Sequence, residues 1–290
     1  MKTHLTFSIL FFIVFPLNIF SQQEKQEGHI NTNKFRQLYE EFSSPNMYRT
    51  ASGAPGPAYY QQQADYKMNI ELDDKNKKVY GDQTVTYINN SPETLSYIWL
   101  QLDQNVRKKD SPSLEIDSDG VGPAYIPDSF DKEFLKSPFD GGFNIEYVTS
   151  TENKPLDYII NQTMMRIDLP NPISTGQSFS FKIKWWYNIN DHVKQDGRSG
   201  YETFPNDDNR AYIIAQFYPR MCVYNEVEGW QNYQFWGDGE FALPFGDFEV
   251  NITVPADHIL EATGELINRK EVYTKDMMKR FNQAKKSFDK

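Results

Sequence analysis

The sequence predicts a mainly β protein built from antiparallel sheets, with a short helix near each end. Aromatic residues make up 15% of the 290 positions, and they are enriched on the half-buried surfaces of strands. Several segments alternate apolar and polar side chains, which is the period of a strand with one buried face. No repeat of fixed period is visible, which argues against a propeller or a solenoid.

The first 21 residues have the pattern of a secretory signal peptide. Lys2 precedes an apolar run over 5–20, and polar residues follow from Ser21. A basic start, an apolar stretch and a small residue at the boundary are typical of such a signal. The run is shorter than the ~20 residues a membrane span needs, so we favour cleavage near Ser21 over an uncleaved anchor. We expect an exported protein, periplasmic, outer-surface or extracellular, without an integral membrane span after cleavage.

Residues 22–62 are predicted to form a helix followed by a linker. Four apolar residues between 31 and 42 fall on one helical face: Phe35, Leu38, Tyr39 and Phe42. Pro and Gly are frequent over 43–58, which indicates a wrapped loop.

A β-domain is predicted over residues 63–272. Strands at 66–72, 79–88 and 95–102 are joined by polar turns, which predicts an antiparallel meander. Residues 103–142, rich in Pro and Gly, indicate a long excursion over the sheet. Further strands are predicted at 144–149, 164–169, 179–189, 211–217 and 248–254. The run 211–217 is nearly all apolar, which is typical of a strand buried on both faces.

Residues 273–290 are predicted to form a helical end. Thr274 is placed to cap it, and Met277 and Phe281 begin an apolar stripe with helical spacing. The stripe continues to Lys290 without a Gly or Pro stop signal. Two interpretations stay open, a natural terminus and a truncated reading frame.

Composition and motifs exclude several functions. The formal net charge is -10, and an acidic chain repels phosphate backbones, so we expect no nucleic-acid partner. A zinc hydrolase needs ligands at a spacing such as H-E-x-x-H, but no histidine has a second histidine within five residues. Residues 115–120 resemble the start of a calcium loop, yet Ile126 stands where a bidentate Glu is required. We expect no catalytic residue and no metal ligand in this chain.

The segment 216–248 is unusually rich in acids, aromatic residues and turn residues. Its notable members are Arg220, Glu226, Glu228, Asp238 and Glu240 with Tyr218, Tyr224, Trp230, Tyr233, Phe235 and Trp236. Either this loop packs on itself, or it presents a surface to a ligand. The single cysteine, Cys222, is expected to be a buried small residue rather than a nucleophile, because no histidine lies near it in sequence.

Two stretches carry a family pattern. One reads AQFYPRMCVYNEVEGWQ and continues, after a short interval, as FALPFGDFEVNITVPADHILEATGEL; the other is the opening YKMNIELDDKNKKVYGDQTVTYINNSPETLSYIWLQL. Most of residues 60–267 thereby resembles the amino-terminal β-domain of gluzincin zinc aminopeptidases, the aminopeptidase N family. The resemblance implies a saddle or sandwich-like domain that shapes substrate access to a catalytic domain downstream. That domain would carry H-E-x-x-H, which is absent here.

The resemblance implies one substrate-binding residue, Gln216. It resembles the β-domain glutamine that reaches the active site and helps hold the amino end of a peptide. An amide carbonyl can accept a hydrogen bond from an ammonium without adding charge; the other interpretation is a glutamine satisfied within its own loop. The resemblance also implies a peptide substrate with a free amino terminus, and zinc in the complete enzyme. This chain alone is expected to be inactive and to bind no zinc.

The alternative is a secreted carbohydrate- or peptide-binding β module. Sugar faces stack on exposed aromatic rings, and Trp186, Trp230 and Trp236 would form the platform.

Overall fold

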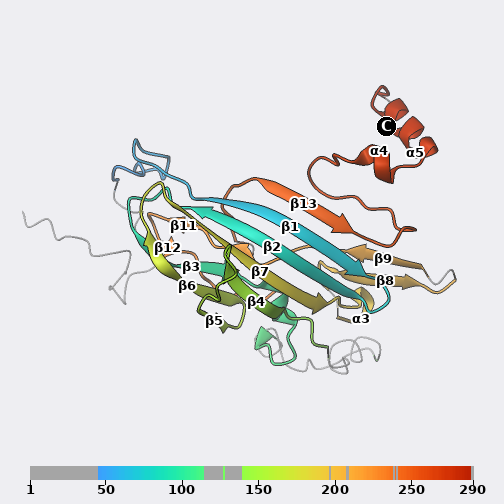
Figure 1. The fold of residues 1–290 in the computed structure, drawn as a ribbon, viewed down its shortest axis with the longest axis horizontal. Helices are drawn as coiled ribbons and strands as arrows, with labels where there is room; N and C mark the ends of the chain where they lie inside the picture. Colours follow the sequence, from blue (N-terminus) through green and yellow to red (C-terminus); the bar gives the residue numbers. More distant parts are fainter. Residues whose placement is uncertain are drawn as a thin grey trace, which may run out of the picture.

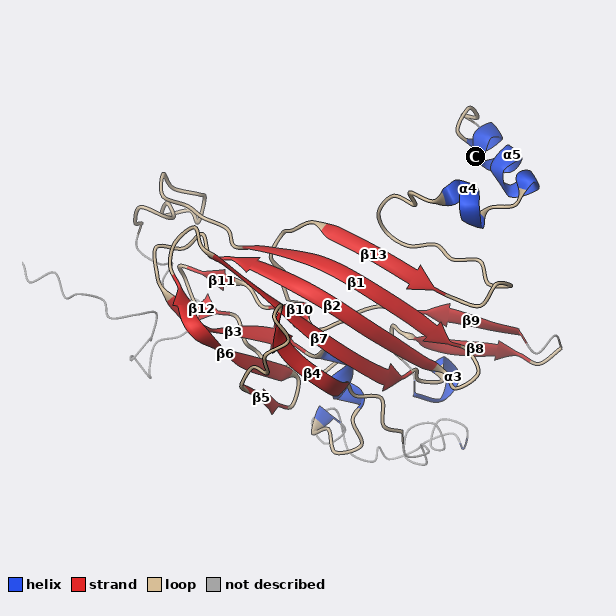
Figure 2. Cartoon of the chain, viewed as in Figure 1, coloured by secondary structure: helices blue, strands red, loops and turns tan. Residues whose placement is uncertain are grey.

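A computed structural model describes residues 45–113, 127, 139–195, 197–206, 209–237, 239 and 241–288. The chain is mainly β, with 41% strand and 12% helix, which confirms the predicted fold class (Figures 1 and 2). The predicted signal peptide and its cleavage, the helix over 31–42 and the calcium-like loop lie outside the described residues.

The larger sheet has five strands in the order β13-β1-β2-β7-β4. Their bounds are Phe248–Thr253 for β13, Gln63–Asp73 for β1, Lys78–Ile88 for β2, Ser178–Asn188 for β7 and Asn144–Ser150 for β4. Figure 1 shows these strands side by side as a long, twisted layer. The pairs are antiparallel except for β1 and β13, which run parallel.

The second sheet has the order β10-β3-β6-β5. These strands are Arg220–Met221, Leu95–Gln101, Met164–Ile173 and Tyr158–Asn161. The predicted meander is therefore wrong in its third member, because β3 pairs with β6 and β10 while β2 pairs with β7.

A buried turn after β2 accounts for this change of sheet. The Asn89 amide nitrogen donates to the carbonyl oxygens of Glu93 at 2.7 Å and Ile173 at 3.0 Å, and its oxygen accepts from the Gln62 amide at 3.0 Å. The side chain is fully buried. These bonds turn the chain towards β6, so that β3 begins in the second sheet.

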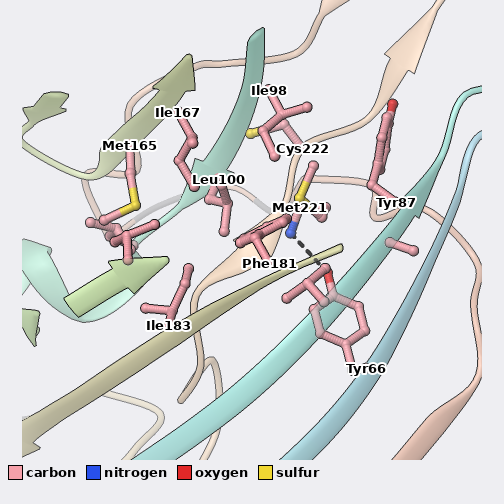
Figure 3. Close-up of a cluster of buried hydrophobic side chains, with 14 of the residues drawn as sticks. Tyr66, Tyr87, Ile98, Leu100, Met165, Ile167, Phe181, Ile183, Met221 and Cys222 are labelled. Carbon is pink, nitrogen blue, oxygen red and sulfur yellow. Dashed lines mark hydrogen bonds between the residues drawn. The ribbon is translucent and has the colours of Figure 1, made fainter. Parts of the chain in front are cut away.

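The core fills the space between the two sheets. The predicted buried face of 179–189 is confirmed, since Phe181, Ile183 and Trp185 of β7 are fully buried. Across from Phe181 and Ile183 lie Ile98 and Leu100 of β3 (Figure 3). The Trp185 ring lies so close to Gly81 that an added Cβ there would come within 2.1 Å of it.

Short elements surround the sheets. They are η1 Asp103–Arg107, α3 His192–Gln195, β8 Gly200–Phe204, β9 Asn209–Ile213, β11 Tyr224–Asn225, β12 Gly229–Trp230, α4 Arg269–Val272 and α5 Lys275–Ala284. None of the helices within the described residues is long and apolar enough to cross a membrane.

Two predictions about these elements have different outcomes. A doubly buried strand over 211–217 is wrong: β9 ends at Ile213, pairs among the described strands only with β8, and leaves Ile213 62% exposed. The helix after Thr274 is confirmed, and the Thr274 hydroxyl accepts from the Met277 N–H at 3.2 Å. Helices α4 and α5 lie away from both sheets, and neither buries a residue (Figure 1).

Candidate functional site

Gln216, the implied substrate-binding residue, has an unusual backbone. Its φ is +51°, in the left-handed region that residues with a Cβ rarely adopt. It lies in the connection between β9 and β10 rather than on a strand. Its side chain is half-buried and makes no hydrogen bond to the described residues. The glutamine is thus not satisfied within the described part of its own loop.

Polar side chains hold the backbone on both sides of Gln216. The buried Gln104 amide donates to the carbonyl oxygens of Ala215 and Gln216, each at 3.1 Å. The Ser199 hydroxyl both accepts from the Ala215 N–H and donates to the Ala215 carbonyl, at 2.9 Å in each case. A left-handed residue persists where its surroundings fix it in this way.

The chain after Gln216 is anchored to the larger sheet. The Gln83 amide nitrogen donates to the Pro219 carbonyl at 2.8 Å. The Tyr66 hydroxyl accepts from the Met221 N–H at 2.9 Å, shown as the dashed line in Figure 3. Burial raises the pKa of the Tyr66 phenol well above its ordinary value, so it stays neutral. Both anchors come from strands β1 and β2, far away in sequence.

A buried ion pair completes this frame. Arg220 donates through Nε and Nη2 to the two carboxylate oxygens of Asp103, at 2.8 and 2.7 Å, and also to the Gln101 side-chain oxygen at 3.3 Å. The Asp103 side chain is 1% exposed and that of Arg220 is 11% exposed. Burial raises the pKa of the Asp103 carboxyl, and the Arg220 charge acts against that rise. The arginine that stands out in the sequence is therefore structural.

Much of the segment after Arg220 packs inward. Cys222 is buried, as predicted, and burial raises the pKa of its thiol. Glu226 is also buried and pairs with Arg49 from the loop before β1. Trp230 and Phe235 are buried too. These residues pack inward against the main core and other segments rather than into a small core of their own, and Phe217 and Tyr218, next to Gln216, also pack partly against the core.

An uncovered apolar surface lies next to this segment. The Phe248 ring is 6.2 Å from that of Tyr218 and stacks at 4.8 Å on that of Tyr66. Phe248 and Val250 pair in register with Tyr66 and Met68, so they lie on the core face of the larger sheet. Tyr66 and Met68 are buried, yet Phe248 is 51% and Val250 37% exposed. We call Phe248, Val250 and Ile252 the β13 strip.

The described residues do not form a metal centre. No group of three or more His, Cys, Asp or Glu side chains among them is placed to hold a metal ion. His258 lies with its Nδ1 3.0 Å from Asp257 and its Nε2 3.9 Å from Asp74. Asp74 in turn bonds Arg210 and the Tyr212 hydroxyl. None of these described carboxylates and histidines is grouped in a way that fits zinc. What Gln216 itself offers a ligand is a side-chain amide.

The three tryptophans of the alternative do not form one platform. Trp186 lies on the outer face of the larger sheet, with the Lys78 ammonium 4.0 Å from its ring centre. Trp230 lies in the core, where its ring is 5.7 Å from that of Tyr87. The proposed platform is wrong, because Trp230 packs into the core.

No protein-family model matches the chain, and no curated protein does. Among solved structures, it matches a two-domain M1 zinc metallopeptidase mutant bound to L-tryptophan, at 15% identity and a TM-score of 0.34 over 74% of this chain and 39% of that one. It also matches an M1 zinc metallopeptidase mutant from Deinococcus radiodurans bound to a Tyr-Ser-Ala substrate, at 14% identity and a TM-score of 0.33 over 71% and 37%. The chain spans less than two fifths of the length of each.

Proposed function

We propose that this chain is the amino-terminal, substrate-shaping β-domain of an exported zinc aminopeptidase, which removes amino-terminal residues from peptides. One observation carries the proposal. Gln216, which the family resemblance implies to be substrate-binding, is held in a left-handed conformation, and its side chain has no partner among the described residues. Backbone strain of this kind clusters at functional sites.

Gln216 would bind the amino end of the substrate. The ammonium of a peptide offers donors, and the side-chain amide oxygen of Gln216 is a neutral acceptor that no described residue occupies. Gln104 and Ser199 keep the Gln216 backbone in place, while Arg220 and Asp103 hold the chain beyond it. The rigid frame would fix the position of the amide before substrate arrives.

A catalytic domain would supply the zinc. When bound there, zinc polarises the scissile carbonyl and activates water. None of the described side chains is grouped to bind it, so the part played by this chain is to position the substrate and cover the cleft.

The test begins with the native protein, captured with antibodies against residues 63–272. We expect an intact mass well above the 33.9 kDa of this chain and release of nitroaniline from alanine p-nitroanilide that a zinc chelator abolishes. The recombinant 290-residue chain should contain far less than one zinc per molecule and should be inactive. Native material of the size of this chain, without chelator-sensitive activity, would overturn the proposal.

The role of Gln216 is tested in the active native-length protein. A hydrogen bond to a charged group contributes about 1.5–3 kcal/mol, so Gln216→Ala should raise KM about 10- to 100-fold for substrates with a free amine. Gln231→Ala is the matched control, since Gln231 is also half-buried but lies after β12. Equal KM values for the two variants would count against the assigned role.

A further inference from the structure

The two edges of the larger sheet differ in whether they are protected against pairing with another strand. At β4, a bulge lies between Ile145 and Tyr147, and the returning chain covers the edge where Thr149 bridges Pro155. The Leu156 N–H also donates to the Val148 carbonyl at 3.0 Å. Bulges and covering loops are the means by which proteins prevent unwanted strand pairing. The edge at β13 has none of these features among the described residues.

Strand β13 is an open edge with regular geometry. It pairs with β1 through six consecutive residues without a register shift, and it contains no Pro, Gly or Lys. Five of its six residues are exposed. An exposed strand of this length presents a row of backbone groups that can pair with another chain.

The backbone direction identifies the groups that are free. The Tyr66 N–H donates to the Asp247 carbonyl at 2.8 Å, and the Ala64 N–H donates to the Phe245 carbonyl at 2.9 Å. Alternate residues of a strand direct their backbone groups to opposite sides. Because Phe245 and Asp247 face β1, the N–H and C=O groups of Phe248, Val250 and Ile252 face the open side.

The two faces beside this edge differ in chemistry. On the core face lies the apolar β13 strip, of which Phe248 is 51% and Val250 37% exposed. The outer face of β1 and β13 carries one ammonium, from Lys67, against four carboxylates from Asp65, Glu71, Asp73 and Glu249. An incoming strand is therefore matched by apolar residues on one face and basic residues on the other.

We propose that the open edge of β13 binds an extended strand of a partner protein, in which apolar residues alternate with basic ones. Such a strand would pair with the outward backbone groups and cover the β13 strip, which is the mode called β-augmentation. A second copy of this chain is a poorer match, because its own β13 contributes Glu249 and no basic residue. The inference goes beyond the proposed function, since it requires no peptidase activity.

Hydrogen exchange at single amides tests the proposal in the full chain. The probe is a synthetic peptide of about nine residues in which Val alternates with Lys and Thr. On binding, we expect at least tenfold slower exchange at Phe248, Val250 and Ile252, with little change at Glu249 and Asn251, which already face β1. Unchanged exchange at the three outward amides would overturn the proposal.

Control peptides separate strand pairing from general attraction. One has the same composition with its Val residues clustered, and another carries Glu in place of Lys. Both should bind at least tenfold more weakly by fluorescence anisotropy. Equal binding of the clustered peptide would show that charge alone is responsible, and would contradict the proposal.

Variants of the edge provide the second test. Val250→Pro removes one outward N–H, and Val250→Lys places a charge on the apolar strip; each should weaken binding about tenfold or more. Val227→Lys is the matched control, since Val227 is 40% exposed on the turn between β11 and β12, and should bind within twofold of the wild type. If Val250→Pro does not fold, Val250→Lys decides. If the wild-type chain forms a dimer in sedimentation and Val250→Lys abolishes it, the strand that binds β13 comes from a second copy, which would overturn the choice of partner.

Discussion

Removing the Asp103 carboxylate is the perturbation that tests the frame around Gln216 most directly. In Asp103→Ala, Arg220 loses two charge-assisted hydrogen bonds, at 2.7 and 2.8 Å, and keeps only the 3.3 Å bond to Gln101. With 11% of the Arg220 side chain exposed, water replaces little of what is lost. The guanidinium is left charged, buried and largely unpaired.

The expected magnitude follows from that burial. Leaving one charge of a buried ion pair without its partner costs about 3–5 kcal/mol. With a urea m-value of about 2 kcal/mol per molar, the unfolding midpoint should fall by about 1.5–2.5 M. Asp103→Asn retains one acceptor oxygen at the same place and should lose less. The double variant Asp103→Leu with Arg220→Met should recover most of the loss, because an apolar pair avoids the desolvation cost of both charges.

The assay is equilibrium unfolding in urea followed by tryptophan fluorescence, which reports on the buried Trp185 and Trp230. Unchanged m-values would show that the variants unfold as the wild type does. A loss below about 1 kcal/mol for Asp103→Ala would refute the reasoning, since that is the contribution of an exposed ion pair. A double variant no more stable than Asp103→Ala would refute the desolvation argument.

Three further outcomes are expected. Gly81→Ala should cost about 1–3 kcal/mol of unfolding free energy, because the new Cβ would meet the Trp185 ring; an unchanged urea midpoint would contradict this packing. Gln216→Gly should leave the thermal midpoint unchanged or raise it, whereas Gln216→Val should lower it, since only Gly adopts a φ of +51° without strain. Equal thermal midpoints for the Gly and Val variants would exclude the strain. Burial raises the pKa of the Cys222 thiol, so a disulfide reagent at pH 8 should modify it only on unfolding. Folding then keeps this thiol protonated, and stability should decline as pH rises above about 8.5, less so in Cys222→Ala.

The sequence predicted most strands because their cause is local. The alternation over 179–189 lies in β7, whose inner face is buried as expected. Thr274 caps its helix through a bond to a residue three positions away. The failures concern long-range partners. The run 211–217 is apolar enough for a buried strand, but β9 ends at Ile213 and pairs, among the described strands, only with β8. The meander failed because buried Asn89 redirects the chain.

The candidate site was only partly predictable. The family resemblance singled out Gln216, and the absence of a nearby histidine predicted an inert Cys222. The residues that position Gln216 gave no signal in the sequence, because Gln83, Gln104 and Asp103 lie more than a hundred positions away from the groups they bond. A polar residue in a strand pattern looks the same whether it faces solvent or a distant carbonyl.

The sequence by itself therefore determined that this chain is a mainly β protein, where most of its long strands lie, and that its one cysteine cannot form a disulfide within the chain. These properties follow from side-chain periodicity and composition, which act over a few residues. Only the tertiary structure decided which strands pair, which carboxylates are buried, and that β13 is an open edge among the described strands. Those properties depend on contacts between segments far apart in the chain, and a one-dimensional pattern does not encode them.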